Sequence, residues 1–327
     1  MISRAFAALL LLCLTASGSV LAEDNAPAVA QPQQAVKLEH KFRANQIDRY
    51  KMVIKMNANI ALPGMPVAIT GTNGMQMNMS IVSVLRSKVL GILPSGDAKL
   101  MYSYESMDMD MDMPGMPKID KSQMQKAQKD VIKNMPKITM VVNKYGQVTS
   151  VEGLDKMPGM PKGMDFSSML VGPNAMGPWS FGLPADQVGV GDAWTQDIPI
   201  LNAGKMTVDY TLESLNAKLG SITAAKIRQD FSGHVEMGDL MKSMIPMMAG
   251  SMSGPAPNII GGMDMSGWGV AYFDAARGRV ARVDSDIDMI MNMSAEAPEG
   301  LAPANGPKTF NINMTMKMKL NMINLGL

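Results

Sequence analysis

Apolar and polar residues alternate strictly over several long stretches of this chain. The clearest is KMTVDYTL at 205–212, where every second residue is apolar. Similar alternation runs through 51–56, 75–81 and 310–322, and the last of these (FNINMTMKMKLNM) is long enough that its strand must curve or twist. Because side chains alternate faces along a strand, this period predicts strands with one buried face.

Two stretches follow a helical period instead. The segment 120–135 (DKSQMQKAQKDVIKNM) spaces its apolar residues three or four positions apart and ends before Pro136. The segment 235–248 has the same spacing, and Pro246 kinks or interrupts it. We therefore predict one helix in each segment.

The order of these elements indicates a weak internal duplication. Each half reads as strands, then a helix, then a hairpin whose turn contains Gly146 or Gly278. An offset of 129 residues also aligns Gly91 with Gly220. The predicted fold class is mainly β (α+β): two similar halves of curved antiparallel sheet, each with one helix packed on it, in a half-barrel-like arrangement.

Composition sets the domain boundaries. Arg4, an apolar run at 5–14 and the small residues up to Ala22 form a signal-peptide pattern with cleavage after Ala22, so we expect a periplasmic or secreted protein. No later stretch is apolar enough to span a membrane. The predicted organisation is a signal peptide at 1–22, a flexible linker at 23–36, a first β-rich half at 37–156, a Pro/Gly/Met-rich connection at 157–184 and a second β-rich half at 185–327.

Charge and cysteine content exclude several kinds of chemistry. The chain has 30 Lys and Arg against 29 Asp and Glu, which argues against a nucleic-acid partner. Its single cysteine, Cys13, lies in the predicted signal peptide, so the mature chain has no disulfide and no thiol nucleophile. Nothing in the sequence identifies a protein partner.

Several short motifs carry a resemblance to known proteins. They are Tyr50-Lys51-Met52, Gly146-x-Val148-x-x-Val151-Glu152-Gly153, Val190-Gly191-Asp192-x-Trp194, Tyr210-Thr211-Leu212-Glu213 and Phe273-Asp274-x-x-x-Gly278. Together they resemble the duplicated secreted bacterial β-proteins that carry a domain of unknown function. A curved sheet with a helix over it also resembles, in architecture only, the half-barrel of periplasmic lipoprotein carriers. Both resemblances imply a fold and name no reaction.

We do not expect an enzyme. His40 and His234 are the only histidines, and they fall in different halves of the chain. No HExxH pair, GxSxG elbow, Walker loop or GxGxxG sequence after a strand is present. No catalytic residue is therefore predicted.

Methionine is the unusual component, with 37 residues in 327, and the stretch 107–113 reads MDMDMDM. In the simplest interpretation these are core residues of a strand, with Met107, Met109, Met111 and Met113 pointing inward and the aspartates outward. However, branched residues suit strands better than methionine does, and methionine specifies a core loosely.

A second interpretation is a methionine-lined apolar face or cavity for a hydrophobic or lipid-like ligand, because polarizable, adaptable thioethers suit promiscuous binding. This is our leading hypothesis, as a secreted non-enzymatic binding protein. The predicted ligand-binding residues are Met289, Met291, Met293, Met314, Met316 and Met318.

A third interpretation is Cu(I) or Ag(I) binding at Met-rich turns, since thioethers select soft ions. The sequence MPGMPK occurs twice, and the candidate ligands are Met113, Met116, Met157 and Met160. Cu(I) is the only cofactor suggested. Two further alternatives stay open: exposed methionines that absorb oxidant, and an envelope structural protein without a small ligand.

Overall fold

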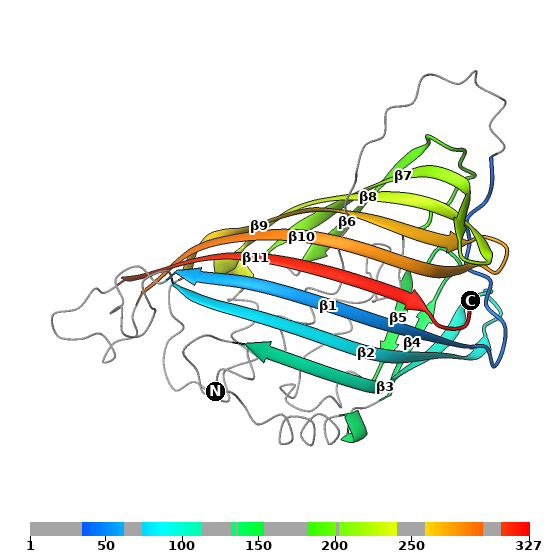
Figure 1. Cartoon of the computed structure of the whole chain (residues 1–327). Coiled ribbons are helices and arrows are strands. Elements are labelled where there is room, and N and C mark those ends of the chain that lie inside the picture. The colour runs from blue at the N-terminus through cyan, green and yellow to red at the C-terminus, as the bar shows by residue number, and fades with distance from the viewer. Residues whose placement is uncertain are drawn as a thin grey trace.

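The fold is a single curved antiparallel sheet that does not close into a barrel (Figure 1). The computed structural model describes residues 35–61, 74–112, 132–134, 137–153, 182–200, 203–240, 259–296 and 309–327. The strands are β1 (Ile47–Ala61), β2 (Met75–Ile92), β3 (Ala98–Asp112), β4 (Ile138–Val142), β5 (Val148–Glu152), β6 (Ala193–Ile200), β7 (Gly204–Leu219), β8 (Ile222–Glu236), β9 (Ile259–Asp274), β10 (Arg279–Glu296) and β11 (Thr309–Asn324).

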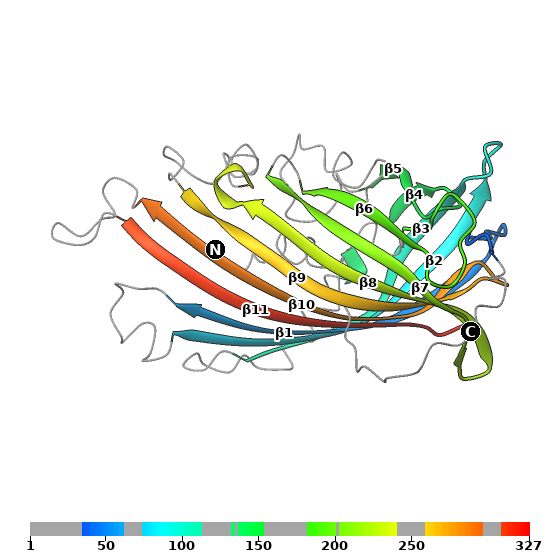
Figure 2. The same cartoon turned by 90° about the horizontal axis from the view of Figure 1, so that it is seen from above.

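The strand order is β5-β4-β3-β2-β1-β11-β10-β9-β8-β7-β6. Two meanders, β1–β5 and β6–β11, are therefore joined where the first strand pairs with the last, and β5 and β6 form the two edges. Seen from above, the long strands sweep through a common curve (Figure 2). The predicted mainly β, half-barrel-like fold is confirmed.

The order within each meander is the one that the duplication predicts. The β2–β3 hairpin precedes the β4–β5 hairpin in the first half, and the β7–β8 hairpin precedes the β9–β10 hairpin in the second. Strand β11 has no counterpart in the first half and lies between the halves, next to β1 and β10. The duplication itself stays a prediction.

The predicted helices lie largely outside the described residues. Within the first, residues 132–134 are helical. Within the second, β8 continues to Glu236, so the helical residues start at Met237, two positions later than the predicted start. The predicted signal peptide at 1–22 and most of the linker and the connection also lie outside the described part of the chain.

One core serves both halves. A single cluster of buried residues includes Met52 and Met79 of the first half together with Met206 and Phe231 of the second. A second, smaller cluster is built by β2–β5 alone and contains Leu85, Val89, Leu100, Tyr102 and others. The halves are therefore not separate lobes.

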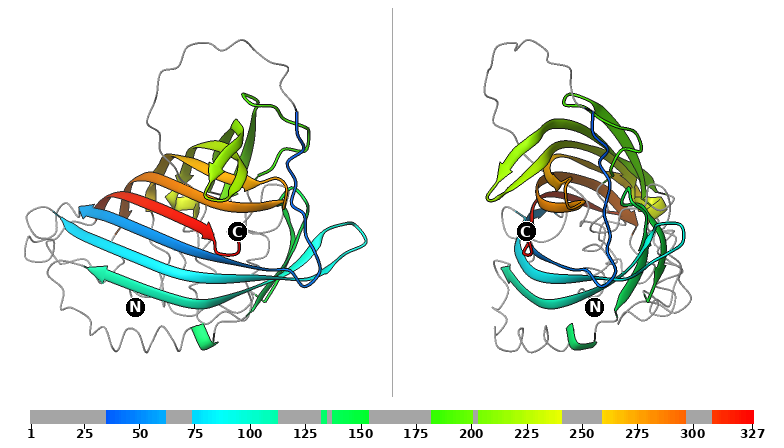
Figure 3. Two further views of the ribbon diagram at one scale, coloured as in Figure 1. Left: turned by 45° about the vertical axis from the view of Figure 1, so that its right-hand side comes forward. Right: turned by 90° about the vertical axis from the view of Figure 1, so that its right-hand side faces the viewer.

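Residues 36–46, which we call the strap, cross one end of the sheet and tie the halves together (Figure 3). Val36 and Val188 exchange two backbone hydrogen bonds of 2.9 Å, and the His40 N–H donates to the carbonyl of Lys144 in the β4–β5 turn. The Lys41 N–H donates to the Gly278 carbonyl in the β9–β10 turn. A Cβ at Gly278 would lie 2.3 Å from the Lys41 nitrogen, and the backbone there has a φ of +65°, so this crossing requires glycine.

The strap is anchored by Leu38, which is completely buried. We expect Leu38→Ala to lower the free energy of unfolding by about 2–5 kcal/mol, because it leaves a cavity in the shared core. The neighbouring Lys37→Ala, at an exposed position, is the matched control and should change stability by less than about 0.5 kcal/mol. Urea unfolding measures both variants; a Leu38→Ala loss as small as that of the control would show that the strap lies outside the cooperative unit.

Candidate functional site

Nearly all described strand methionines lie on one face of the sheet. Directly opposed residues of antiparallel strands share a face, so the register assigns each side chain. Nineteen methionines lie on the concave side, which we call the methionine face: Met52, Met56, Met75, Met77, Met79, Met107, Met109, Met111, Met140, Met206, Met263, Met265, Met289, Met291, Met293, Met314, Met316, Met318 and Met322. By the same register Met101, opposite Lys88, is on the outer face.

The MDMDMDM stretch is the second part of β3. Met107, Met109 and Met111 are partly buried and pack against the main core, whereas Asp108, Asp110 and Asp112 are exposed. The prediction that these three methionines point inward and the aspartates outward is therefore confirmed; Met113 lies outside the described residues.

A bulge in β3 makes this orientation possible. Leu85 pairs with Tyr104 and Val84 with Ser106, so Glu105 is the extra residue. The bulge shifts the inward positions from even to odd numbers, because one added residue reverses the alternation of faces. Without it the three aspartates would face the core.

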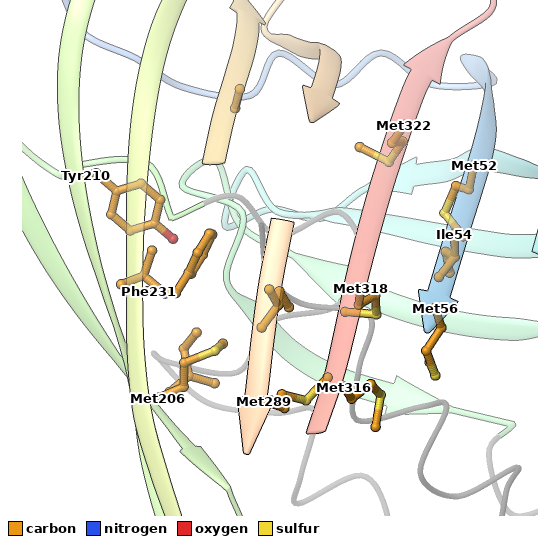
Figure 4. Packing of buried hydrophobic residues seen from close by; sticks show 14 of the residues in the cluster. Met52, Ile54, Met56, Met206, Tyr210, Phe231, Met289, Met316, Met318 and Met322 are labelled. Carbon is orange, nitrogen blue, oxygen red and sulfur yellow. The ribbon is translucent and has the colours of Figure 1, made fainter. Parts of the chain in front are cut away.

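The six predicted ligand-binding methionines are brought together in adjacent strands, and Figure 4 shows three of them, Met289, Met316 and Met318. Met289 is opposite Met316, and Met291 is opposite Met314. Met265 and Met263 of β9 continue the same two rows. These two rows form a block of six thioethers, which we call the methionine block and whose neighbouring Cβ atoms are about 4.5–5.5 Å apart. It consists of Met263, Met265, Met289, Met291, Met314 and Met316. Met318 and Met293 extend the block along β11 and β10.

Exposure along the methionine face increases with distance from the strap. Met318 and Met322 are 1% and 4% exposed. Met75, Met111 and Met293, where β2 begins and β3 and β10 end, are only partly buried. The end remote from the strap is therefore the accessible rim of this face.

Toward β6 the concave face is lined by aromatic side chains more than by methionines. Tyr210 is completely buried, and its ring stacks on Trp194 with 5.3 Å between centroids. The Trp194 Nε1–H donates to the Gly182 carbonyl at 2.7 Å. Rigid aromatic groups thus bound the adaptable methionine rows on one side.

One polar atom in the middle of the face has no partner. Ser285 is opposite Leu320, which places it on the methionine face, and it is 6% exposed. Its Oγ makes no hydrogen bond within the described part of the chain. A buried hydroxyl without a partner is costly, so Ser285 is the residue here that a polar group of a ligand would satisfy.

A second feature lies under the strap, where a cavity of about 40 Å³ is lined by both polar and apolar side chains. Arg279 Nη1 donates to Asp48 Oδ1 at 2.7 Å, and Gln46 Nε2 donates to Asp48 Oδ2 at 2.5 Å. Burial raises the pKa of the nearby Tyr50 and Tyr102 hydroxyls above the ordinary tyrosine value. The cavity is far smaller than a lipid-like ligand, and its Asp48–Arg279 pair joins the two halves.

His40 belongs to this cavity and stacks on Phe42. Its ring donates to the Gly278 carbonyl, while the buried Nε2 atom has no partner in the described residues. Burial lowers the pKa of His40 to about 4, although the Gly278 carbonyl and the Asp48 carboxylate favour its protonated form. A neutral His40 is therefore part of the folded structure.

His234 lies on the outer face of β8, where it is exposed, unlike His40. Its Nδ1 is 2.6 Å from Asp264 Oδ1, and its Nε2 is 3.3 Å from Glu236 Oε1. Both contacts raise the pKa of this exposed histidine. Sequence reasoning did not find this cluster, since Asp264 reaches it from β9 by strand pairing. The described residues hold no group of three or more His, Cys, Asp or Glu with metal-binding geometry.

The predicted soft-metal ligands Met113, Met116, Met157 and Met160 lie outside the described residues, so their arrangement stays a prediction. Within the described residues, no helix is long and apolar enough to cross a membrane.

No family model and no curated protein matches the sequence. Among solved structures, the chain is similar to one of lipid–protein interactions in lipovitellin, with 9% identity and a TM-score of 0.39 over 87% of this chain. It spans 25% of that lipovitellin chain. It is also similar to DynF from the dynemicin biosynthesis pathway of Micromonospora chersina (11% identity, TM-score 0.16, 93% of this chain and 94% of that chain). A third is OpdQ of Pseudomonas aeruginosa, with 6% identity and a TM-score of 0.23 over 86% of this chain and 99% of that chain. Such scores carry no argument about function.

The lowered pKa of His40 makes stability depend on pH. Between pH 6.5 and about 4 the unfolded chain binds a proton at this residue and the folded chain does not, so the free energy of unfolding falls as the pH falls through this window. From pH 7 to pH 4.5 we expect His40 to account for a loss of about 2 kcal/mol. Urea unfolding at both pH values should show a smaller loss in His40→Gln than in the wild type.

The matched control is His234→Gln, which removes the exposed histidine whose pKa is raised instead. A raised pKa stabilises the fold at low pH, so this control should not reduce the acid-induced loss. Equal pH dependence in His40→Gln and the wild type would show that His40 is protonated in the folded protein.

Proposed function

We propose that the protein binds an apolar, lipid-like molecule along the methionine face. The observation that carries this proposal is the collection of nineteen methionines from eight described strands on one side of the sheet. Polarizable side chains with three flexible torsions adapt to ligands of different shape. The expected secretion signal would place such a binding protein in the periplasm or outside the cell.

The two cores differ in methionine content, which argues against a role for methionine in core packing alone. Thirteen of the 34 buried residues of the shared core are methionines. The smaller core of the same sheet has one methionine, Met140, among eight buried residues and otherwise uses Leu, Val, Ala and Tyr. The chain therefore builds an ordinary core where packing alone is needed. Methionine is concentrated in the larger core, which the two halves share.

Two features support an amphiphilic ligand. The partly buried rim residues Met75, Met111 and Met293 provide an entry at the end remote from the strap. The Ser285 hydroxyl, buried without a partner, would accept or donate one hydrogen bond to a polar group of the ligand. No catalytic step is part of this proposal, and the predicted absence of enzymatic activity stays a prediction.

Met316→Asp tests the binding face. Met316 is 3% exposed and belongs to the methionine block, so a carboxylate there should weaken binding of the neutral fluorescent probe N-phenyl-1-naphthylamine by at least about tenfold. Met101→Asp is the matched control, because it introduces the same charge on the outer face of the same sheet. Probe titration measures both variants, with circular dichroism to confirm that each is folded.

Should Met316→Asp fail to fold, Met316→Phe and Ser285→Ala take its place. The first should narrow the range of ligand sizes that bind, and the second should weaken binding of amphiphiles more than of hydrocarbons. Unchanged probe and amphiphile affinity in all folded variants would refute the proposed site.

The block of six methionines favours soft-metal binding as a second candidate function. Met265, Met289 and Met316 lie side by side in one row, and Met263, Met291 and Met314 in the next. Three thioethers at such spacing form a ligand set that prefers Cu(I) or Ag(I) to harder ions. The sheet thus offers an alternative to the Met-Pro-Gly-Met turns.

Leucine substitution separates the two candidates, because it keeps apolar volume and removes sulfur. If Cu(I) binds in the sheet, changing Met289, Met291, Met314 and Met316 to Leu should weaken its affinity at least about a hundredfold while probe binding is kept. Competition with a calibrated Cu(I) chelator measures this. The control changes the four turn residues Met113, Met116, Met157 and Met160 to Leu. Loss of affinity only in that control would place the metal at the turns, and no competition by any form of the protein would exclude Cu(I) binding.

A further inference from the structure

Large apolar side chains are exposed mainly at one end of the sheet. Among the described residues, the exposed ones are Ile47 (46%), Leu90 (42%), Ile92 (42%), Leu93 (38%), Ile260 (67%), Ile290 (50%), Ile323 (37%) and Leu325 (48%). Six of these eight lie at the strap end, and only Ile260 and Ile290 do not. Isolated exposed apolar residues are ordinary, but a group at one end of a molecule marks an interaction surface.

The six residues lie in or next to β1, β2 and β11, at the same end of the sheet. Ile47 is opposite Lys88, and the Asn45 N–H donates to the Val89 carbonyl, so the start of β1 lies beside residue 90. Ile323 is opposite Lys51, and the Leu325 N–H donates to the Arg49 carbonyl. Leu90, Ile92 and Leu93 belong to the β2–β3 hairpin, which projects beyond the rest of the sheet (Figure 3). We call this group the apolar end.

The tip of this hairpin is well formed. The Leu93 N–H donates to the Asp97 carbonyl at 2.8 Å, and the Gly96 N–H donates to the Leu93 carbonyl at 2.9 Å. The Ser95 hydroxyl donates to the Asp97 carboxylate at 3.0 Å. The apolar side chains are therefore presented by a closed turn.

The second half of the chain shows that such a hairpin does not need an exposed apolar tip. In the alignment that superimposes Gly91 on Gly220, Ile92 corresponds to Ser221. The β7–β8 hairpin turns at these residues, and no large apolar side chain is exposed there. Leu90 and Leu93 correspond to Leu219 and Ile222, which are also apolar but are not exposed, so the two hairpins differ in how far they expose their apolar side chains.

Cations surround the apolar end. Arg43, Lys51, Arg86 and Lys88 make no ion pair in the described part of the chain. Of the carboxylates nearby, Glu105 pairs with Arg49 at 2.5 Å and Asp48 with Arg279 at 2.7 Å, whereas Asp97 at the hairpin tip accepts a hydrogen bond from Ser95 and makes no ion pair in the described part of the chain.

One of these cations, Arg86, lies next to another arginine, Arg49. Arg86 is directly opposite Arg49 on the outer face, and like charges in that position destabilise a sheet. Glu105 compensates one of the two charges. The remaining surplus is stabilised when an anionic surface lies against it.

From the exposed apolar hairpin and its surrounding cations, we propose that the strap end docks on an anionic lipid bilayer, with Leu90, Ile92 and Leu93 entering the headgroup region. Apolar side chains beside Lys and Arg fit a membrane surface, where the former leave water and the latter meet lipid phosphates. A nucleic acid would use the cations and leave the apolar tip in water. The proposal does not depend on what the methionine face binds.

Vesicle sedimentation tests the docking. The purified protein should bind vesicles of phosphatidylcholine and phosphatidylglycerol, and should bind vesicles of phosphatidylcholine alone at least about tenfold more weakly. Leu90→Ser with Ile92→Ser removes the apolar tip, and the second change introduces the residue of the sister hairpin. We expect this variant to lose about tenfold or more in partitioning onto the anionic vesicles.

Arg86→Gln with Lys88→Gln should cause a similar loss, and it should also reduce the dependence of binding on salt. Two matched controls lie away from the strap end: Ile260→Ser removes the most exposed apolar side chain, and Lys317→Gln with Lys319→Gln removes two cations of the outer face. Both should leave vesicle binding unchanged.

Two results would overturn the proposal. One is vesicle binding by the tip and cation variants equal to that of the wild type and the controls. The other is concentration-dependent self-association of the wild type that Ile92→Ser abolishes, without any binding to vesicles, which would make the apolar end a contact between two copies of this chain.

Discussion

The antiparallel pairing of β1 with β11 is the constraint on which the rest of the structure depends. It is the only join between the two meanders within the sheet, and it aligns Met52 with Met322, Met56 with Met318 and Ala58 with Met316. A slip of one residue would move every methionine of β11 to the outside and bring Lys317 and Lys319 into the core. On the outer face these lysines pair with Asp288 and Asp286 of β10, which opposes the slip from the other side.

Both this pairing and the strap hold the two halves of the chain together. The first and last strands are far apart in the sequence, so their contact is non-local and its closure is entropically costly. The strap and the Asp48–Arg279 pair add connections between the halves at one end. The other end has no such connection among the described residues, and there Met75, Met111 and Met293 are partly exposed.

Local patterning accounts for most of the strands and for the side of the sheet on which their residues lie. Alternation alone predicted the inward Met109 and the outward Asp110, and it grouped the six candidate methionines of β10 and β11. It could not predict the bulge at Glu105, the pairing of β1 with β11 or the environment of His40, because each depends on residues far away in the sequence. Ser285 had no sequence signal at all, since its missing partner is a property of its surroundings.

Side chains with few rotamers lie at the end of the sheet that the strap connects, and flexible side chains lie away from that end. Near the strap, the smaller core uses branched residues and Tyr102, which hold few rotamers. Away from it, the rows through Met289 and Met316 offer many nearly equal packings, which alone would specify a fold poorly. The stiff, tied end therefore fixes the register, and that register keeps the adaptable side chains on one face. A sheet so divided can vary the shape of its methionine face without losing its strand order, which a uniformly packed core cannot do.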